Sequence, residues 1–358
     1  MDASDANNEI PLVNAAWVPQ PSSVPWPTST WSRGETSSLV HEVVDEAFRL
    51  PELSTTNAVV VVHRGHIVAE RYFGAKEHFD QPPEPITAET KLISWSMAKS
   101  MIHALVGMLV DDGRLSADQL APVPEWSDLR DPRHAIRLAD LLAMRDGLDY
   151  VEDYVDGAVS NVIEMLFGSG RADVAGYTAA RPLKHEPDSL FNYSSGTTNV
   201  ISRIVAQEVG FGDSYKSFIE SRLFHPIGMM SAEPTMDDAG VFIGSSFVHA
   251  TAQDFARFGY LYLRGGQWDG QQILSTNWTG TAQVPHSVEV ESGNYYSWQW
   301  WVTADQYGTY WASGYDGQQI SVVPALDAVI VRLGRTPAER NVELRAWRGR
   351  LLDALSAS

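Results

Sequence analysis

The 358-residue chain contains no cysteine, which excludes disulfides, thiolate metal sites and a cysteine nucleophile. Basic residues are also scarce, because 26 Lys and Arg stand against 45 Asp and Glu, for a formal net charge of −19. A surface of that sign repels phosphate backbones and anionic lipid headgroups. We therefore expect neither nucleic acid nor a membrane as a partner.

Several familiar signals are missing as well. No apolar run reaches the ~20 residues that a membrane-spanning helix needs. The first eleven residues lack a basic start followed by an apolar stretch, so we expect no signal peptide and a cytoplasmic location. Neither a Gly-x-Ser-x-Gly elbow nor a His-Glu-x-x-His motif occurs, and the ten histidines show no metal-ligand spacing. We predict no metal and no cofactor.

The pattern of hydrophobic residues predicts a large mixed fold. At 44% hydrophobic content the chain can build a sizeable core. Residues 1–35 are rich in Pro, Ser, Asn and Trp and are interpreted as an extended arm. Periodicity predicts helices at 37–50, 96–112, 137–144, 198–209 and 338–355, and strands at 58–62, 67–72, 297–302, 309–313, 318–323 and 328–333.

Strands therefore cluster near both ends of the chain, with helices between them. We predict an α/β (α+β) fold in which one antiparallel sheet is assembled from both chain ends and flanked by helices. The predicted domains are a discontinuous α/β domain at 36–93 and 248–358, and an inserted, mainly helical domain at 94–247.

One lysine stands in an unusual place. Lys99 follows Ser96 by three residues at the start of an apolar helix, so the two side chains share a face. Desolvation among apolar neighbours lowers the pKa of a lysine, which makes its neutral amine available as a base for the serine hydroxyl. The Ser96 N–H, at a helix start, would serve as an oxyanion donor. The alternative is a capping serine beside a lysine that reaches solvent.

Two later segments offer complementary chemistry. Tyr193 lies on a polar loop before a helix, where a phenol near a lysine can relay a proton; the alternative is an ordinary loop tyrosine. Gly314–Gln318 lies at a strand edge, where glycine allows close approach of a substrate; the alternative is a plain hairpin turn. Four nearby tryptophans are candidates for an apolar pocket wall: Trp298, Trp300, Trp301 and Trp311.

The order Ser-x-x-Lys, loop Tyr and late Gly motif resembles the penicillin-binding protein and β-lactamase superfamily of serine hydrolases. Three flanking segments strengthen the resemblance. They are Leu141-Leu-Ala-Met-Arg-Asp-Gly-Leu148, with Asp146 where the family has Ser, Phe224-His-Pro-Ile-Gly-Met229 and Ala250-Thr-Ala-Gln-Asp-Phe-Ala-Arg-Phe-Gly259. The resemblance spans roughly residues 40 to 355. Within the family, the chain is most similar to the class C branch that holds carboxylesterases and 6-aminohexanoate-dimer hydrolases.

This resemblance implies roles for nine residues. Tyr154, in a segment similar to the dimer hydrolases, would lie over the substrate and bond the scissile amide nitrogen. The backbone N–H of Tyr315 would complete the oxyanion hole with Ser96. The implied catalytic set is Ser96, Lys99, Tyr193 and Tyr315, and the implied substrate-binding set is Tyr154, Ser195, Gly314, Asp316 and Gly317.

Two departures from the family bear on substrate. The stretch Ser313-Gly314-Tyr315 lacks the cation that holds the antibiotic carboxylate in β-lactamases, and Ser195 replaces the Asn of many relatives. The resemblance thus implies a hydrolase of small carboxylic esters or linear amides, with an acyl-enzyme on Ser96. A D-alanyl carboxypeptidase or β-lactamase, and a non-catalytic scaffold on the same fold, are the alternatives. A homodimer stays open.

Overall fold

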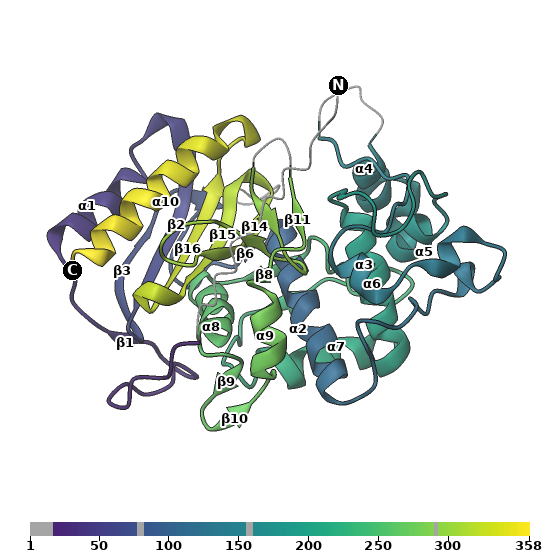
Figure 1. Cartoon of the computed structure of the whole chain (residues 1–358). Helices are drawn as coiled ribbons and strands as arrows, with labels where there is room; N and C mark the ends of the chain where they lie inside the picture. Colours follow the sequence, from purple (N-terminus) through teal and green to yellow (C-terminus); the bar gives the residue numbers. More distant parts are fainter. Residues whose placement is uncertain (1–16, 77–81, 155–159, 290–292) are drawn as a thin grey trace, which may run out of the picture.

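The core is a twisted sheet whose strands come from both ends of the chain, as the sequence predicts (Figure 1). The computed structural model describes residues 17–76, 82–154, 160–289 and 293–358. Within these ranges the sheet has nine strands in the order β1-β3-β2-β16-β15-β14-β13-β12-β11. Neighbours pair antiparallel except β1 and β3, which are parallel. Its strands are β1 (Ser32–Arg33), β2 (Thr55–His63), β3 (His66–Tyr72), β11 (Ser287–Val288), β12 (Tyr295–Tyr296), β13 (Trp301–Val302), β14 (Tyr310–Gly314), β15 (Gln318–Val323) and β16 (Ala328–Arg335).

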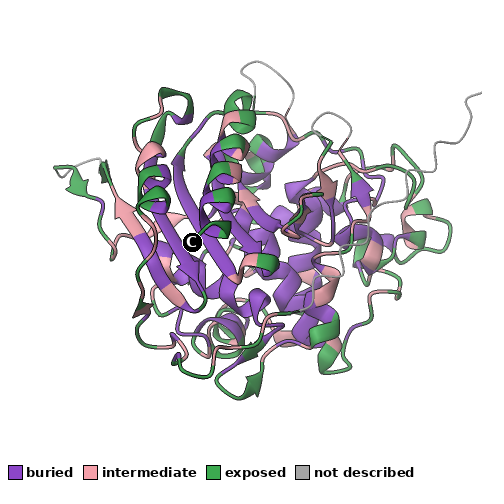
Figure 2. Cartoon of the chain, turned by 60° about the vertical axis from the view of Figure 1, so that its left-hand side comes forward, coloured by how far each residue is buried: buried purple, intermediate pink, exposed green. Residues whose placement is uncertain are grey.

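Helices cover both faces of this sheet, so its central strands are buried and carry unbroken β-branched runs. α1 (Ser38–Glu46) and α10 (Asn341–Ser356) lie side by side on one face, where Trp347 packs with Val61 and Ile330 (Figure 1). α8 (Ala252–Leu263) packs on the other face against β15 and β16. Figure 2 shows the buried layers between the sheet and the helices, with exposed residues on their outer sides.

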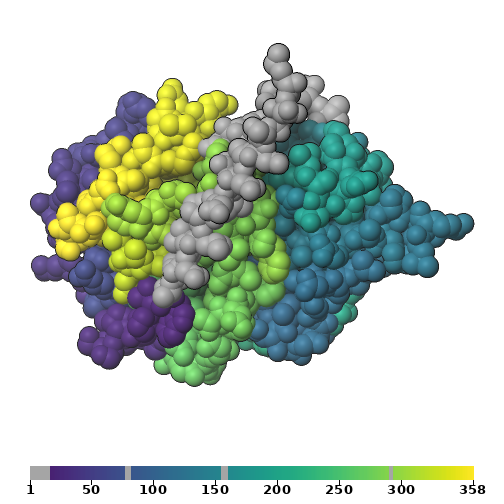
Figure 3. All heavy atoms as spheres, viewed as in Figure 1, coloured from purple at the N-terminus to yellow at the C-terminus, as the bar shows by residue number. Residues whose placement is uncertain are grey.

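The middle of the chain is mainly helical and lies beside the sheet (Figures 1 and 3). The division into domains at residues 94 and 247 stays a prediction. The longest of these helices, α2 and α6, pack against each other and bring the middle of the chain to the sheet. The helices are α2 (Ala98–Asp111), α3 (Leu138–Leu142), α4 (Asn161–Phe167), α5 (Val174–Ala179), α6 (Ser195–Val209) and α7 (Asp213–Ile219), and α9 (Thr276–Thr281) follows α8.

Short strands outside the main sheet complete the fold. They are β4 (Ala75–Lys76) with β5 (Glu84–Pro85), β6 (Leu92–Ile93) with β8 (Val248–Ala250) and β7 (Glu233–Pro234), and β9 (Gln267–Trp268) with β10 (Gln271–Gln272). The β6–β8 pair joins the segment before α2 to the segment before α8. Of the predicted arm at 1–35, only residues 17–35 are described. They run along α8, where the Val18 N–H donates to the Leu263 carbonyl, and end in β1.

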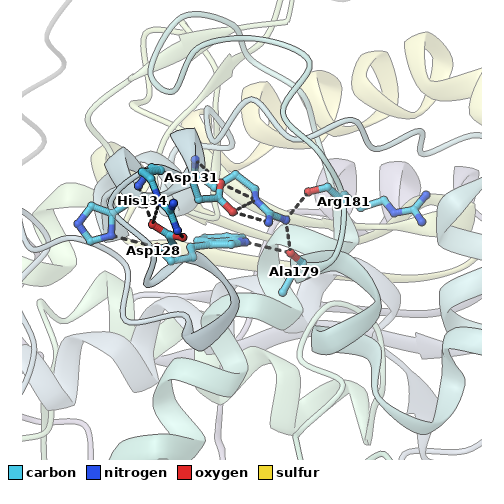
Figure 4. Close-up of polar contacts among 8 residues, drawn as sticks. Asp128, Asp131, His134, Ala179 and Arg181 are labelled. Atoms are coloured by element: carbon cyan, nitrogen blue, oxygen red, sulfur yellow. Dashed lines mark hydrogen bonds and ion pairs between the residues drawn. The ribbon is translucent and has the colours of Figure 1, made fainter.

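The outer edge of the helical region is fastened by one arginine. The Arg133 guanidinium donates to the Asp131 carboxylate and to the carbonyls of Ala179 and Arg181, where these residues converge in Figure 4. The Trp126 indole N–H donates to the same Ala179 carbonyl at 2.9 Å. These bonds tie the loop before α3 to the end of α5. They fix the start of the loop that carries Tyr193.

Several predicted element boundaries differ from the structure, and three of these differences have a clear local reason. The helix expected from residue 96 begins at Ala98, after a 3-10 turn at Trp95–Met97. The helix expected from 198 begins at Ser195, because the Ser194 side chain caps it by accepting from the Thr197 N–H at 3.0 Å. The strand expected at 297–302 is only β13, because Gln299 adopts φ +61° in a tight turn.

Candidate active site

Lys99 and Ser96 meet at the junction of the 3-10 turn and α2. The Lys99 Nζ lies 2.9 Å from Ser96 Oγ, 2.9 Å from Ser195 Oγ and 3.1 Å from the Ser245 carbonyl oxygen. Lys99 is 2% exposed, and this burial lowers the pKa of its amine to about 8, against the opposing field of Glu152. A lysine with this pKa is neutral in about a tenth of the molecules at pH 7, far more often than an exposed lysine, and the neutral amine is the form that a general base requires.

The backbone around Ser96 is shaped for exposure of its side chain. Trp95 adopts φ +45°, a strained conformation for a bulky residue, immediately before the serine. The Trp95 ring contacts the rings of Tyr315 and Phe247, at centroid distances of 5.7 and 5.8 Å. Ser96 itself is half-buried and lines a cleft, whereas Met97 and Ala98 are fully buried. The strained turn therefore holds the hydroxyl at the cleft wall.

Tyr193 lies against the same pair of residues. Its loop is pinned by Asn192, whose N–H donates to the Met144 carbonyl and whose side-chain amide donates to the Tyr150 carbonyl. The Tyr193 ring centroid lies 4.8 Å from Lys99 Nζ. Burial and the Glu152 charge raise the pKa of the phenol, and its hydrogen bond with Ser96 opposes that rise. Tyr193 therefore keeps its proton at neutral pH and contacts the candidate nucleophile.

The turn after β14 lies beside Ser96 and contains Tyr315, whose N–H is the predicted second oxyanion donor. A 3-10 turn at Tyr315–Gly317 follows Gly314, and another contains Ser96, so both Ser96 N–H and Tyr315 N–H lie in first turns that offer them no internal acceptor. Gly314 is required by space, because a Cβ there would lie 2.3 Å from the Ser94 carbonyl oxygen and 3.2 Å from Ser96 N. A side chain at this position would push β14 away from the nucleophile.

These groups face one cleft of about 700 Å³. The Tyr154 and Tyr315 rings pack at a tilt over part of it, at a centroid distance of 4.8 Å, and Trp301 stacks on Tyr193 at 5.6 Å. Among the described lining residues there is no lysine or arginine. The lining residues are Ser96, Glu152, Asp153, Tyr154, Tyr193, Glu289, Trp301, Ser313, Gly314, Tyr315, Asp316, Gly317, Thr336, Pro337, Ala338, Glu339 and Asn341.

The structure thus brings together eight of the nine predicted site residues at the cleft or on the nucleophile, and sets one behind it. Ser195 does not line the cleft: it is fully buried, and its hydroxyl contacts Lys99 and Glu152. The substrate-binding role expected for Ser195 is therefore corrected to a contact of the candidate base, since a buried hydroxyl at α6's first turn has no open path to a substrate.

Sequence reasoning missed Glu152. This half-buried carboxylate accepts hydrogen bonds from the Ser195 N–H, from the Ser195 hydroxyl at 2.8 Å and from the Tyr154 hydroxyl at 3.2 Å. It stands in the acidic segment 149–156, where a carboxylate on a loop gives no signal of its own in the sequence. Asp156, in the same segment, lies outside the described residues.

Of the four tryptophans proposed as a pocket wall, Trp301 alone is among the described lining residues of the cleft. Trp300 is fully buried and stacks on Phe258 at 5.9 Å, and Trp311 is buried under the Arg348 guanidinium. Trp298 packs against Trp278. Trp298 and Trp300 lie in the turn before β13 and pack inward, whereas Trp311 pairs with Trp301 across β13 and β14 and is covered by Arg348. The proposal of a tryptophan wall was therefore wrong for these three residues.

In the described residues, no helix is long and apolar enough to cross a membrane.

Known proteins of similar sequence and fold match most of this chain. The 6-aminohexanoate-dimer hydrolase of Paenarthrobacter ureafaciens is 26% identical over 353 residues, which cover 90% of this chain and 85% of that protein. A Bacillus anthracis structure provisionally assigned the same name is 21% identical, with a TM-score of 0.72, and covers 94% of this chain and 88% of that one. A family VIII carboxylesterase is 15% identical, with a TM-score of 0.66, and covers 89% of this chain and 99% of that one.

A broader match identifies the family. Residues 55–354 match the beta-lactamase family, a range that holds the Ser96–Lys99 pair, Tyr193 and the turn after β14. Members of this family are serine hydrolases. The chain therefore belongs to the beta-lactamase family of serine hydrolases.

Proposed function

We propose that the protein hydrolyses small carboxylic esters and linear amides through an acyl-enzyme on Ser96. The observation that carries this proposal is the buried Lys99 amine 2.9 Å from the Ser96 hydroxyl, at the wall of a cleft that Tyr193 and Tyr315 also line. The names of two relatives, the 6-aminohexanoate-dimer hydrolase of Paenarthrobacter ureafaciens and the family VIII carboxylesterase, support this substrate class.

The pKa values divide the roles of base and acid. Burial lowers the pKa of Lys99 to about 8 and raises that of Tyr193 above its usual range, so Lys99 is the resting base and Tyr193 the resting acid. Lys99 Nζ takes the Ser96 proton as Ser96 Oγ bonds to the substrate carbonyl carbon. The carbonyl oxygen becomes an oxyanion, held by the N–H groups of Ser96 and Tyr315.

Collapse of this intermediate breaks the bond to the leaving group. Tyr193 gives its proton to the leaving oxygen or nitrogen and regains a proton from the Lys99 ammonium, which lies beside its ring. For an amide, the Tyr154 hydroxyl, which donates to Glu152, accepts a hydrogen bond from the departing N–H. Water then attacks the ester carbonyl on Ser96 and gives a proton to Lys99. The bond to Ser96 Oγ breaks as the acid product forms, and Ser96 Oγ takes that proton back, which regenerates the hydroxyl and the neutral amine.

The charge of the cleft argues against the alternative of a β-lactamase or carboxypeptidase. Both kinds of enzyme act on substrates that carry a carboxylate, which a cation at the site would hold. The described lining instead carries five carboxylates and no lysine or arginine. They are Glu152, Asp153, Glu289, Asp316 and Glu339. An anionic substrate would therefore enter against repulsion. A non-catalytic scaffold has no use for a desolvated lysine beside a serine.

Purified protein tests the proposal on a panel of a short p-nitrophenyl ester, 6-aminohexanoate dimer and a chromogenic cephalosporin. We expect turnover of the ester, of the amide or of both, slow or absent cephalosporin turnover, and loss of all activity in Ser96→Ala with an unchanged melting curve. Full activity in Ser96→Ala would disprove the acyl-enzyme. Rapid cephalosporin turnover would disprove the argument from charge.

A further inference from the structure

Ser195, which contacts the candidate base Lys99, is itself held by Glu152. The Ser195 hydroxyl donates to Glu152 Oε1 at 2.8 Å, and the Ser195 backbone N–H donates to Glu152 Oε2. The Tyr154 hydroxyl donates to the same carboxylate at 3.2 Å. A carboxylate offers only acceptors, so each of these bonds has one direction. Glu152 also lies at the N-terminus of α6, where the helix dipole favours a negative charge.

The direction of these bonds decides where the Lys99 lone pair points. A hydroxyl has one proton, and Ser195 gives it to Glu152, so Ser195 Oγ can only accept from Lys99. The Ser245 carbonyl also only accepts. A neutral amine has two N–H bonds and one lone pair. Both N–H bonds are committed to these two acceptors, and the lone pair is left facing the Ser96 hydroxyl.

We propose that Glu152 is a positioning residue that fixes the direction of the Ser195–Lys99 hydrogen bond, so that the lone pair of the neutral amine is presented to Ser96 alone. This inference rests on the proposed function of the Ser96–Lys99 pair. Without the carboxylate, the Ser195 hydroxyl is free to turn its proton toward the lone pair, and it then competes with Ser96 for the base at the same 2.9 Å distance.

The charge of Glu152 also affects the pKa of Lys99, which gives a second measurable effect of this residue. Burial lowers the pKa of Lys99, and the carboxylate raises it. In the described structure the other ionisable side chain against the amine is the phenol of Tyr193, from the loop before α6. α6 itself contributes the Ser195 hydroxyl, and the 245 loop contributes a carbonyl. Removal of the Glu152 charge should therefore lower the pKa of Lys99.

A double-mutant cycle between Glu152 and Ser195 tests the proposal. In Glu152→Gln, the amide oxygen must serve the Ser195 N–H, so the amide NH₂ faces Ser195 Oγ and reverses the bond. We expect a loss of roughly 10²-fold in the acylation rate, the scale of a misdirected general base, with little change in KM. In a Ser195→Ala background no competing hydroxyl exists, and the same change should cost less than about threefold. The acid limb of kcat/KM should shift to lower pH.

Two further variants keep the result interpretable. Glu152→Asp preserves an acceptor and should retain most of the activity lost in Glu152→Gln. Glu339→Gln removes a charge from the same cleft without a hydrogen bond to Ser195, and its effect should multiply with that of Ser195→Ala within about twofold. The rate at which a fluorophosphonate labels Ser96 gives the same readout without turnover, and thermal melts confirm folding.

Equal losses from Glu152→Gln in both backgrounds would overturn the positioning role, as would an Asp variant no better than the Gln variant. The proposed function would survive that result as long as Ser96→Ala is inactive. Activity in Ser96→Ala would instead overturn the function itself, so the two failures are distinguishable.

Discussion

Two buried ionisable side chains stand one turn apart on α2, and only one of them belongs to the site. Lys99 and His103 are both almost wholly inaccessible, at 2% and 0% exposure. Burial lowers the pKa of both groups, to about 8 for Lys99 and about 3 for His103. A perturbed pKa in the interior therefore does not mark a catalytic group by itself.

The difference lies in what their partners face. His103 contacts the Tyr262 hydroxyl at 2.7 Å and the Thr281 hydroxyl at 2.9 Å, and its ring stacks on Trp278 at 4.9 Å. Every one of these groups belongs to the packing between α2, α8 and α9. Lys99, by contrast, contacts Ser96, whose hydroxyl lines the cleft. A titratable group becomes functional when one of its partners is open to a ligand.

The largest expected effect is the loss of activity when Lys99 is replaced, which no replacement of His103 should reproduce. Lys99→Met removes the base and replaces a buried amine by an apolar side chain of similar length. We expect a loss of roughly 10³-fold or more in kcat/KM for an ester substrate. Its melting temperature should be unchanged or higher, because the cost of desolvating the amine is removed. Steady-state kinetics and thermal melts measure both. Activity within tenfold of the parent would exclude Lys99 as the base.

The corresponding change at His103 should affect stability instead. His103→Leu leaves the buried Tyr262 and Thr281 hydroxyls without their imidazole partner, at a cost of about 2 kcal/mol in the free energy of unfolding. Urea unfolding measures that loss, while kcat/KM of the folded variant should stay within about threefold of the parent. A tenfold loss of activity without loss of stability would place His103 in the site.

The free energy of unfolding should also depend differently on pH in the parent and in His103→Leu. The folded-state pKa of His103 lies below the value of 6.5 for the free side chain, so its stabilising contribution is present above pH 6.5 and is lost as the pH falls toward 3. The parent should therefore lose stability across that window. His103→Leu should show a shallower decline. A parallel decline in both proteins would mean that the imidazole is not held neutral.

The sequence was sufficient for the part of the site that follows from local spacing. Ser96 and Lys99 are three residues apart, and an apolar helix buries whatever stands on its inner face, so their contact and the low pKa of the lysine could be predicted. The sheet built from both chain ends followed from where β-branched runs occur. The same local reasoning applies to His103, which is buried because its neighbours on α2 are apolar.

The sequence did not predict the hydrogen bonds that hold Lys99 and Ser195 in place. Glu152 resembles any exposed carboxylate of an acidic segment, and only the return of its loop to the first turn of α6 gives it the two donors of Ser195, in addition to the neighbouring Tyr154 hydroxyl. The Ser245 carbonyl is a backbone group that every residue has, so no residue type announces it. Such contacts depend on tertiary packing between segments 40 to 150 residues apart in the chain, as the Lys99–Ser245 separation of 146 shows.

A smaller effect, in the pH dependence of activity, sharpens the contrast between the two groups. Lys99 acts as a neutral amine, and its pKa is lowered to about 8, so kcat/KM should rise as the pH increases through 8 and fall about tenfold per unit below it. His103 stays neutral throughout this range and contributes no limb. The profile measured between pH 6 and 9.5 should therefore be the same in His103→Leu. An acid limb near pH 6.5 that disappears in His103→Leu would reverse the assignment, because it would make the imidazole the group whose deprotonation the reaction needs.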